Sequence, residues 1–218
     1  MQRLIAEAYR LHLTCGLEKM LRFEGMSRVA GVDEAGRGSL AGPVVAAAVI
    51  PDPQRLVPGV DDSKRLSSGF REELAERVKE SSLAWSVASV SAGDVDRVNV
   101  LEATRLAMQS CVASLSPGPD CVLVDAMPLS TGVPTLPVFR GESLSYSIAC
   151  ASILAKVERD RRMVDLDHLY PMYGFSANKG YGARQHLEAL EAYGPSPIHR
   201  LTFRSVVPRL EVARKWVS

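Results

Sequence analysis

The chain has 218 residues, of which 46% are hydrophobic and 23% are charged. This size and balance are typical of a globular domain that buries a full core without disulfides or structural metals. No apolar run approaches the roughly 18 residues that are needed to cross a bilayer. The N-terminal segment also lacks the apolar stretch and the cleavage site of a secretory signal. We therefore expect a cytoplasmic, monomeric protein that makes no contact with membranes.

The formal net charge of +1 neither favours nor excludes nucleic acid as a partner. From Asn178 onward, however, seven Lys or Arg stand against three Glu, so this segment carries a charge of +4. That excess indicates either ordinary solvated charge or a phosphate-binding face. The four cysteines have no C-x-x-C spacing and lie in mostly apolar segments, so we expect them to be reduced and buried. The scattered histidines argue against a zinc site.

Hydrophobic periodicity and turn residues predict the elements in chain order. The first half is expected to hold a helix over 2–24, strands over 28–33 and 43–50, a helix over 68–80 and a strand over 83–90. Ser91 then fits the N-cap of a capping box, and the helix that it begins runs to about Leu115. The second half is expected to hold strands over 121–125 and 134–139, and helices over 142–169, 182–193 and, near the end, 205–215.

The order of these elements indicates the fold class. The first strands follow one another as hairpins and the later ones alternate with helices, which is typical of an α/β domain with a mixed sheet. The continuous apolar run over 43–50 predicts a strand that is buried on both faces. We divide the chain into an N-terminal helix over 1–26, a central α/β domain over 27–170 and a C-terminal helical cap over 171–218.

Acidic residues at the ends of buried strands are the most informative feature. Asp33 ends one predicted strand with Glu34 directly after it, and Asp125 ends another. Neighbouring side chains on a strand point to opposite faces, so Asp33 and Glu34 can share a site only if the strand breaks between them. Three carboxylates at one sheet edge repel one another, and a divalent cation removes that conflict. Oxygen ligands without His or Cys favour Mg²⁺ or Mn²⁺. The alternative is that each acid caps a turn.

A second pattern overlaps this region and is rejected. The residues from Gly36 to Ala41 match the G-x-G-x-x-A fingerprint of dinucleotide-binding proteins. That fingerprint requires a helix directly after the glycines, whereas Gly42-Pro43 and a strand-like apolar run follow here. No phosphate-binding loop of the G-x-x-x-x-G-K-[ST] type is present either.

Six motifs in family order resemble ribonuclease HII. They are GVDEAGRGSLAGPVVAAAVI (31–50), DDSKRLS (61–67), VLVDA (122–126), GESLSYSIACASILAKVERDRRM (141–163), YGFSANKGYGARQH (173–186) and GPSPIHRLTF (194–203). The resemblance covers roughly residues 27–208. It implies a ribonuclease H-like mixed sheet flanked by helices, with a C-terminal helical region. It also implies an endonuclease that hydrolyses the RNA strand of RNA–DNA hybrids, cuts at single ribonucleotides embedded in duplex DNA, and leaves 5′-phosphate ends.

The resemblance further implies two Mg²⁺ or Mn²⁺ ions at four catalytic carboxylates. Asp33, Glu34 and Asp125 match the family directly. The fourth family ligand is an Asp that follows Gly, and Glu142 stands at that position here. The extra methylene of Glu puts the geometry of one metal in question. Milder departures are Ser39, Asn178 and Ala183, which replace Pro, His and Thr.

Selection of a ribonucleotide requires detection of its 2′-hydroxyl. Gly36 and Gly38 permit a close approach of the main chain to that hydroxyl. We expect Arg37 to hold an adjacent phosphate with its guanidinium group, and the Tyr181 ring to pack on the neighbouring sugar. The alternatives are an exposed loop arginine and a core tyrosine, and the resemblance favours the functional interpretation of both.

Two further lysines are weaker candidates for the site. Lys64 and Lys179 are equally well interpreted as phosphate contacts and as surface lysines. The charged run over 156–162 is interpreted as including a solvated helix face.

Two other functions stay open at this point. The first is a ribonuclease HIII-like enzyme, although such chains carry an extra N-terminal substrate-binding domain and only a predicted helix precedes the first strand here. The second is a non-catalytic module that binds hybrids, which a lost carboxylate would favour. Glu142 keeps the negative charge at the altered position.

Overall fold

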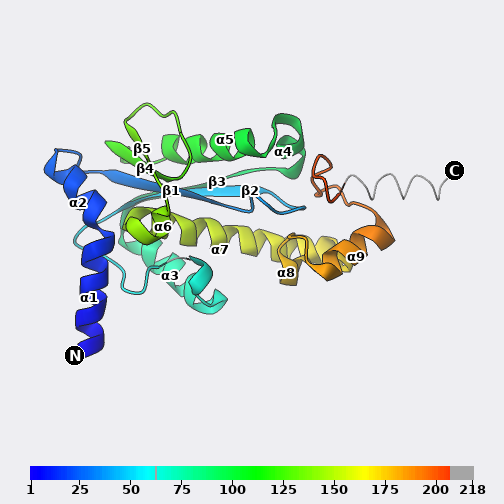
Figure 1. Cartoon of the computed structure of the whole chain (residues 1–218), viewed down its shortest axis with the longest axis horizontal. Helices are drawn as coiled ribbons and strands as arrows, with labels where there is room; N and C mark the ends of the chain where they lie inside the picture. The colour runs from blue at the N-terminus through cyan, green and yellow to red at the C-terminus, as the bar shows by residue number, and fades with distance from the viewer. Residues whose placement is uncertain (62, 207–218) are drawn as a thin grey trace.

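The computed structural model describes residues 1–61 and 63–206. In chain order its elements are α1 Gln2–Thr14, α2 Gly16–Phe23, β1 Val29–Ala35, β2 Val44–Pro51, η1 Ser63–Arg65, α3 Ser68–Ser81, β3 Ser82–Val90, α4 Ala92–Val98, α5 Val100–Ala113, β4 Cys121–Asp125, β5 Thr135–Val138, α6 Gly141–Leu144, α7 Tyr146–Leu169, η2 Pro171–Tyr173, α8 Phe175–Asn178 and α9 Arg184–Tyr193. Figure 1 shows a sheet between two helical layers, with α4 and α5 on one face and α3 and α7 on the other.

The five strands form one mixed sheet in the order β3-β2-β1-β4-β5. The pairs β1–β2 and β2–β3 are antiparallel, whereas β1–β4 and β4–β5 are parallel. The mixed α/β sheet predicted from the sequence is thereby confirmed. All eight residues of β2 are buried, as its continuous apolar run predicts.

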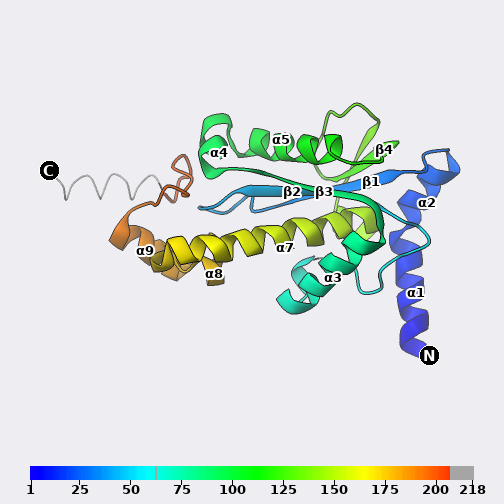
Figure 2. The ribbon, with the colours of Figure 1, turned by 180° about the vertical axis from the view of Figure 1, so that it is seen from behind.

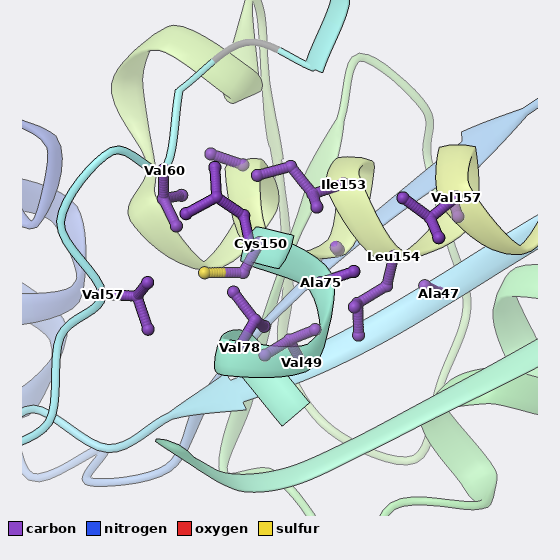
Figure 3. Close-up of a cluster of buried hydrophobic side chains, with 14 of the residues drawn as sticks. Ala47, Val49, Val57, Val60, Ala75, Val78, Cys150, Ile153, Leu154 and Val157 are labelled. Atoms are coloured by element: carbon purple, nitrogen blue, oxygen red, sulfur yellow. The ribbon is translucent and has the colours of Figure 1, made fainter. Parts of the chain in front are cut away.

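The longest helix, α7, packs directly on the sheet because both surfaces carry small residues. A Cβ on Gly31 of β1 would lie 2.0 Å from the carbonyl carbon of Ser147, so only glycine allows this approach. Figure 3 shows the core on this face, where Val49 of β2, Val78 of α3 and Leu154 of α7 belong to one cluster of buried side chains. A second core lies under α5, and all four cysteines are buried and free.

Each of the three longest predicted helices is interrupted by one residue. The helix predicted over 2–24 breaks at Cys15, whose side chain is buried in the core. The helix predicted from Ser91 begins there, since Ser91 accepts a hydrogen bond from Asp94 N–H, but it breaks at Asn99. The helix predicted over 142–169 breaks at the extended Ser145. Asn99 and Ser145 each accept a main-chain hydrogen bond and so cap a new helix.

The C-terminal part of the described chain packs at the end of α7, away from α1 (Figure 2). Phe175 and Leu190 pack there against Leu40 and Met163. No helix was predicted between residues 169 and 182, and the short helix α8 lies there. The helix predicted near 205–215 lies, from residue 207 onward, outside the described residues. The three-part division of the chain stays a prediction.

Among the described residues, no helix is both long enough and apolar enough to span a membrane.

Candidate active site

The parallel pairing of β1 and β4 brings two predicted carboxylates to neighbouring positions. The register between the strands ends at the pair Val32–Val124, and Asp33 and Asp125 are the next residues on each strand. Side chains alternate along a strand, so both aspartates lie on the sheet face that α7 covers.

Strand β1 does not end at Asp33. It continues through Glu34 and Ala35, because these residues pair with Ala46 and Val45 of β2. The predicted strand end is therefore wrong by two residues. Glu34 nevertheless lines a pocket of about 370 Å³ that also holds Arg37.

The pocket collects most of the residues predicted for the site. Its lining includes Glu34, Gly36, Arg37, Gly38, Lys64, Glu142 and Tyr181. Asp33 is 4% exposed, and its partner Ser152 lines the pocket. A larger hollow of about 730 Å³ is lined by Pro43, Ser91 and Arg162, among others, but by none of the four predicted carboxylates.

A chain of hydrogen bonds joins Asp33 to Glu142. Asp33 Oδ1 accepts from Glu34 N–H at 2.8 Å, and the Ser152 hydroxyl hydrogen-bonds to the Asp33 carboxylate. The hydroxyls of Ser152 and Ser63 are 2.9 Å apart, and Ser63 N–H donates to Glu142 Oε2 at 3.3 Å. Two carboxylates from distant parts of the chain are thus held in one polar network.

The other carboxylate contacts involve the start of α6. Asp125 Oδ1 accepts from Gly141 N–H at 2.8 Å, and the next residue, Glu142, forms an ion pair with Lys64 at 2.9 Å. A Cβ on Gly141 would lie 2.6 Å from Ile148 Cδ1 and 3.2 Å from Asp125 Oδ1. Glycine before the acid is therefore required by packing.

The raised pKa values of Asp33 and Glu34 show that a negative charge is costly on these buried, neighbouring carboxylates. Burial raises the pKa of Asp33 well above its usual value, and the charges of Glu34 and Glu142 raise it further. Burial also raises the pKa of Glu34; the positive charge of Arg37 opposes that shift, and Asp125 adds to it. Among residues 1–61 and 63–206, no Lys, Arg or His lies within ion-pair distance of Asp33 or Asp125.

The donor set fits a hard divalent cation. It consists of carboxylate oxygens with neighbouring seryl hydroxyls, which are the ligands that Mg²⁺ and Mn²⁺ prefer. Within the described part of the chain, however, no three acidic, His or Cys side chains already converge as a metal site. One Glu142 oxygen is instead occupied by the Lys64 ammonium group. Cation binding therefore requires these side chains to move together.

Arg200 holds the loop that carries the Gly-Arg-Gly sequence. It is fully buried and donates to the carbonyl oxygens of Gly36 at 2.8 Å, Arg37 at 2.9 Å and Gly42 at 3.0 Å. Burial lowers the pKa of Arg200 to about 10. The main chain on both sides of the Arg37 side chain is thus fixed from beneath.

Arg159 of α7 supports the same loop from a second direction. It is also fully buried and donates to Pro43 O at 3.1 Å, Ala41 O at 3.2 Å and Ser39 Oγ at 2.7 Å. Ser39, which departs from the family pattern, therefore supplies an acceptor that Pro lacks. The charged run over 156–162 includes a solvated face at Arg161, as interpreted, whereas Arg159 in the same run points into the protein.

The two glycines of the loop have different roles. Gly36 has φ +88°, and a Cβ there would lie 1.8 Å from Arg159 Nε, so the packing beneath the loop requires glycine. No atom lies within 4 Å of a Cβ placed on Gly38, which leaves open space at the pocket. Gly38 is thus the position where a ligand can approach the main chain.

Arg37 and Tyr181 lie at the rim of the pocket. The Arg37 side chain is 49% exposed and lies 3.7 Å from Glu34. The Tyr181 ring packs over the Arg159 guanidinium, 5.3 Å from ring centroid to Cζ, and the residue is 40% exposed. Tyr181 is therefore not the core tyrosine of the alternative interpretation.

Lys179 lies outside this pocket. Its ammonium group contacts the carbonyl oxygen of Ser176, and it lines a separate hollow with Asp160. Four lining residues were not predicted: Ala35, Ser63, Ser152 and Lys156. Ser152 and Lys156 are four residues apart on α7, and that spacing was the available signal for a shared face.

The sequence of the chain is similar to that of one known protein family. The family model described as Ribonuclease HII matches residues 30–206. A Ribonuclease HII from Desulfitobacterium hafniense is 46% identical over 209 residues, which cover 95% of this chain and 80% of the relative.

Solved structures show the same fold. Ribonuclease H2 from Pyrococcus horikoshii OT3 superposes with a TM-score of 0.74 at 28% identity, over 86% of this chain and 99% of that one. Bst-RNase HIII in complex with Mn²⁺ gives a TM-score of 0.65 at 19% identity, over 86% of this chain and 70% of that one, and so shares the fold. The chain belongs to the ribonuclease HII family and is an endonuclease of the ribonuclease H type 2 class.

Proposed function

We propose that the chain hydrolyses the RNA strand of RNA–DNA hybrids and cuts at single ribonucleotides embedded in duplex DNA. The observation that carries this proposal is the shared pocket of Glu34, Glu142, the Gly-Arg-Gly loop and Tyr181. An acidic hydrolytic centre thereby adjoins main-chain and aromatic groups that suit a ribose. The products are expected to carry 5′-phosphate and 3′-hydroxyl ends.

We propose that Asp33, Glu34, Asp125 and Glu142 hold Mg²⁺ or Mn²⁺, with two ions at the scissile phosphate. When bound, such ions lower the pKa of an attacking water and offset the charge on the leaving 3′-oxygen. The carboxylates suit this role because their charges conflict without a cation. Lys64 forms an ion pair with Glu142, and we propose its 78% exposed side chain as a phosphate contact in the substrate complex.

The residues at the rim bind and orient the substrate. Arg37 is placed to hold a phosphate with its guanidinium group, and the main chain at Gly36 and Gly38 to meet the 2′-hydroxyl. The Tyr181 ring presents an exposed face for the neighbouring sugar. Lys179 lies in a separate hollow and is proposed only as a contact with more distant duplex phosphates. The cytoplasmic location and monomeric state stay predictions.

Identity to the relatives favours this proposal over a ribonuclease HIII-like activity. The Ribonuclease HII from D. hafniense is 46% identical, whereas the Bst-RNase HIII neighbour is 19% identical. A non-catalytic hybrid-binding module is disfavoured because all four acidic positions keep a carboxylate, and Glu34 and Glu142 line the same pocket.

The test is incubation with a duplex that carries one ribonucleotide, in Mg²⁺, in Mn²⁺ and in excess EDTA. We expect metal-dependent cutting of this duplex and none of the matched all-DNA duplex. Binding without cutting would identify a hybrid-binding module, and a strong preference for a longer RNA tract would favour the HIII-like activity. Full cutting in EDTA would contradict the metal assignment.

A further inference from the structure

Two buried histidines join the Tyr181 main chain to the segment around residue 199. His186 of α9 and His199 are 0% and 2% exposed, and their Nε2 atoms lie 2.9 Å apart. At one end, His199 Nδ1 is 2.9 Å from Ser196 N, and at the other, His186 Nδ1 is 2.8 Å from Tyr181 O. Four residues thus form one continuous hydrogen-bonded relay.

The two ends of the relay determine which ring nitrogens carry protons. Ser196 N–H can only donate, so His199 Nδ1 accepts and the neutral ring carries its proton on Nε2. That proton is donated to His186 Nε2, so His186 carries its own proton on Nδ1 and donates it to the Tyr181 carbonyl oxygen. Starting from the carbonyl, which can only accept, gives the same assignment. An added proton on either ring would place two donors face to face.

The surroundings of the relay favour neutral rings. The rings of Tyr173 and Phe175 pack against both histidines, with centroids 4.8 to 6.3 Å apart. Burial and the neighbouring His186 lower the pKa of His199 to about 4. At neutral pH His199 is therefore uncharged, as the proton assignment requires.

Tyr181 is held independently at its main chain and at its ring. The preceding Gly180 fits against Ala41, where a Cβ would lie 2.5 Å from the carbonyl oxygen. The ring packs over Arg159, whose Nη1 is buried and makes no hydrogen bond within the described part of the chain. The electron-rich ring face is the partner available to that charge. A shift of the Tyr181 main chain would move the ring off this support.

We propose that His186 and His199 are positioning residues that set the place of the Tyr181 ring over the ribonucleotide. This inference rests on the proposed role of Tyr181 in binding substrate. The relay reaches the catalytic pocket through its hydrogen bond from His186 to Tyr181, which lines that pocket.

Two substitutions at position 199 separate the relay from general packing. His199→Asn keeps an acceptor for Ser196 N–H but does not reach His186. His199→Gln places a donor near His186 but leaves Ser196 N–H without its acceptor. Both variants lose the ring, but His199→Asn loses the contact with His186, whereas His199→Gln loses the contacts with both the Ser196 N–H and the Ser196 hydroxyl. Any larger loss of stability therefore falls on His199→Gln, whereas only His199→Asn disconnects Tyr181.

Cleavage of the single-ribonucleotide duplex is measured as kcat and KM, below the melting temperature of every variant. We expect His199→Asn to lower kcat/KM about tenfold, the size of one lost hydrogen bond, and His199→Gln to stay near the parent. In a Tyr181→Ala background the two variants should become equal, because the ring that the relay positions is gone.

Equal losses for the two variants, or a difference that persists in the Tyr181→Ala background, would overturn the relay. Cutting by Tyr181→Ala at the parent rate would instead refute the substrate role of Tyr181, and the relay with it. A parent that cuts no duplex would refute the proposed function itself. Should His199→Asn not fold, the pair His186→Gln and His186→Asn repeats the test, since only His186→Gln loses the bond to Tyr181.

Discussion

The Gly-Arg-Gly loop lines one pocket with two of the four carboxylates, Glu34 and Glu142, but the loop and the acids are held in opposite ways. Arg159 and Arg200 hold the loop through several hydrogen bonds each, and both side chains are fully buried. The carboxylates are instead tied to separate partners, as Asp125 is to Gly141 and Glu142 is to Lys64. The surface proposed to bind the substrate is therefore preformed, whereas we expect the proposed catalytic centre to assemble only around a cation.

The loop and the carboxylates also differ in their electrostatics. Burial lowers the pKa of Arg159 and of Arg200, and neither forms an ion pair with a described carboxylate. Two buried positive charges beneath the loop favour an anion above it, such as a phosphate. Burial raises the pKa of Asp33, which favours a cation beside it. Each region is thus complementary to a different part of a metal-bearing nucleic acid.

The largest expected effect comes from the carboxylates. Asp33→Asn or Asp125→Asn should lower turnover by roughly a thousandfold or more, because charge stabilisation at the reacting phosphate is lost. The melting temperature of Asp33→Asn should not fall, since Asn still accepts from Glu34 N–H and relieves a buried charge. Single-turnover cleavage and thermal unfolding measure the two quantities. Cleavage near the parent rate would remove these aspartates from the catalytic centre.

Glu142 tests how far the centre adjusts to a longer acid. Glu142→Gln keeps the length of the side chain but removes its negative charge, so cleavage should fall by roughly a hundredfold. Its melting temperature should barely change, because the amide oxygen still accepts from Ser63 N–H. Glu142→Asp is the matched control and should retain activity, or improve it with Mg²⁺. Undiminished cleavage by Glu142→Gln in both metals would leave three carboxylates to carry the chemistry.

Substitutions of Arg37 and of Arg159 should affect different properties, namely cleavage for Arg37 and the stability of the fold for Arg159. Arg37→Ala removes an exposed side chain, so cleavage should fall about tenfold with little change in melting. Arg159→Met leaves the acceptors at Ser39, Ala41 and Pro43 without a donor, and should destabilise the fold by about 3 kcal/mol. Paired melting and cleavage assays distinguish the two. If Arg37→Ala melts far earlier than the parent, its role is structural.

The features that could be predicted from the sequence are those that produce a pattern in a short stretch of residues. Apolar runs identified the strands, and Asp33 and Asp125 were recognisable because acids at the ends of buried strands are unusual. The interruptions at Asn99 and Ser145 were missed because a capping side chain inside an apolar repeat does not disturb its periodicity. Local periodicity thus predicts that a helix exists but not where it is divided.

The buried arginines were missed for a different reason. Arg159 lies in a charged run, and composition alone places such a run in solvent. Its acceptors are main-chain carbonyls 116 and 118 residues away in sequence, which no side-chain pattern encodes. The same holds for His186 and His199, whose pairing depends on the packing of α9 against the segment near residue 199. Such contacts are visible only once the chain has folded.

The smallest expected effect is a dependence of the free energy of unfolding on pH, with opposite signs for the histidine relay and for Asp33. The pKa of His199 is lowered to about 4, so the unfolded chain binds a proton first as the pH falls below about 6.5. The relay therefore loses stability as the pH falls from about 6.5 to 4, by roughly 1 kcal/mol per pH unit. Asp33, whose pKa is raised, gains stability as the pH falls. Denaturant unfolding of the parent and of His199→Gln isolates the histidine, because Asp33 is common to both chains. The free-energy advantage of the parent over the variant should shrink toward pH 4, and a constant difference would show that His199 does not titrate in this range.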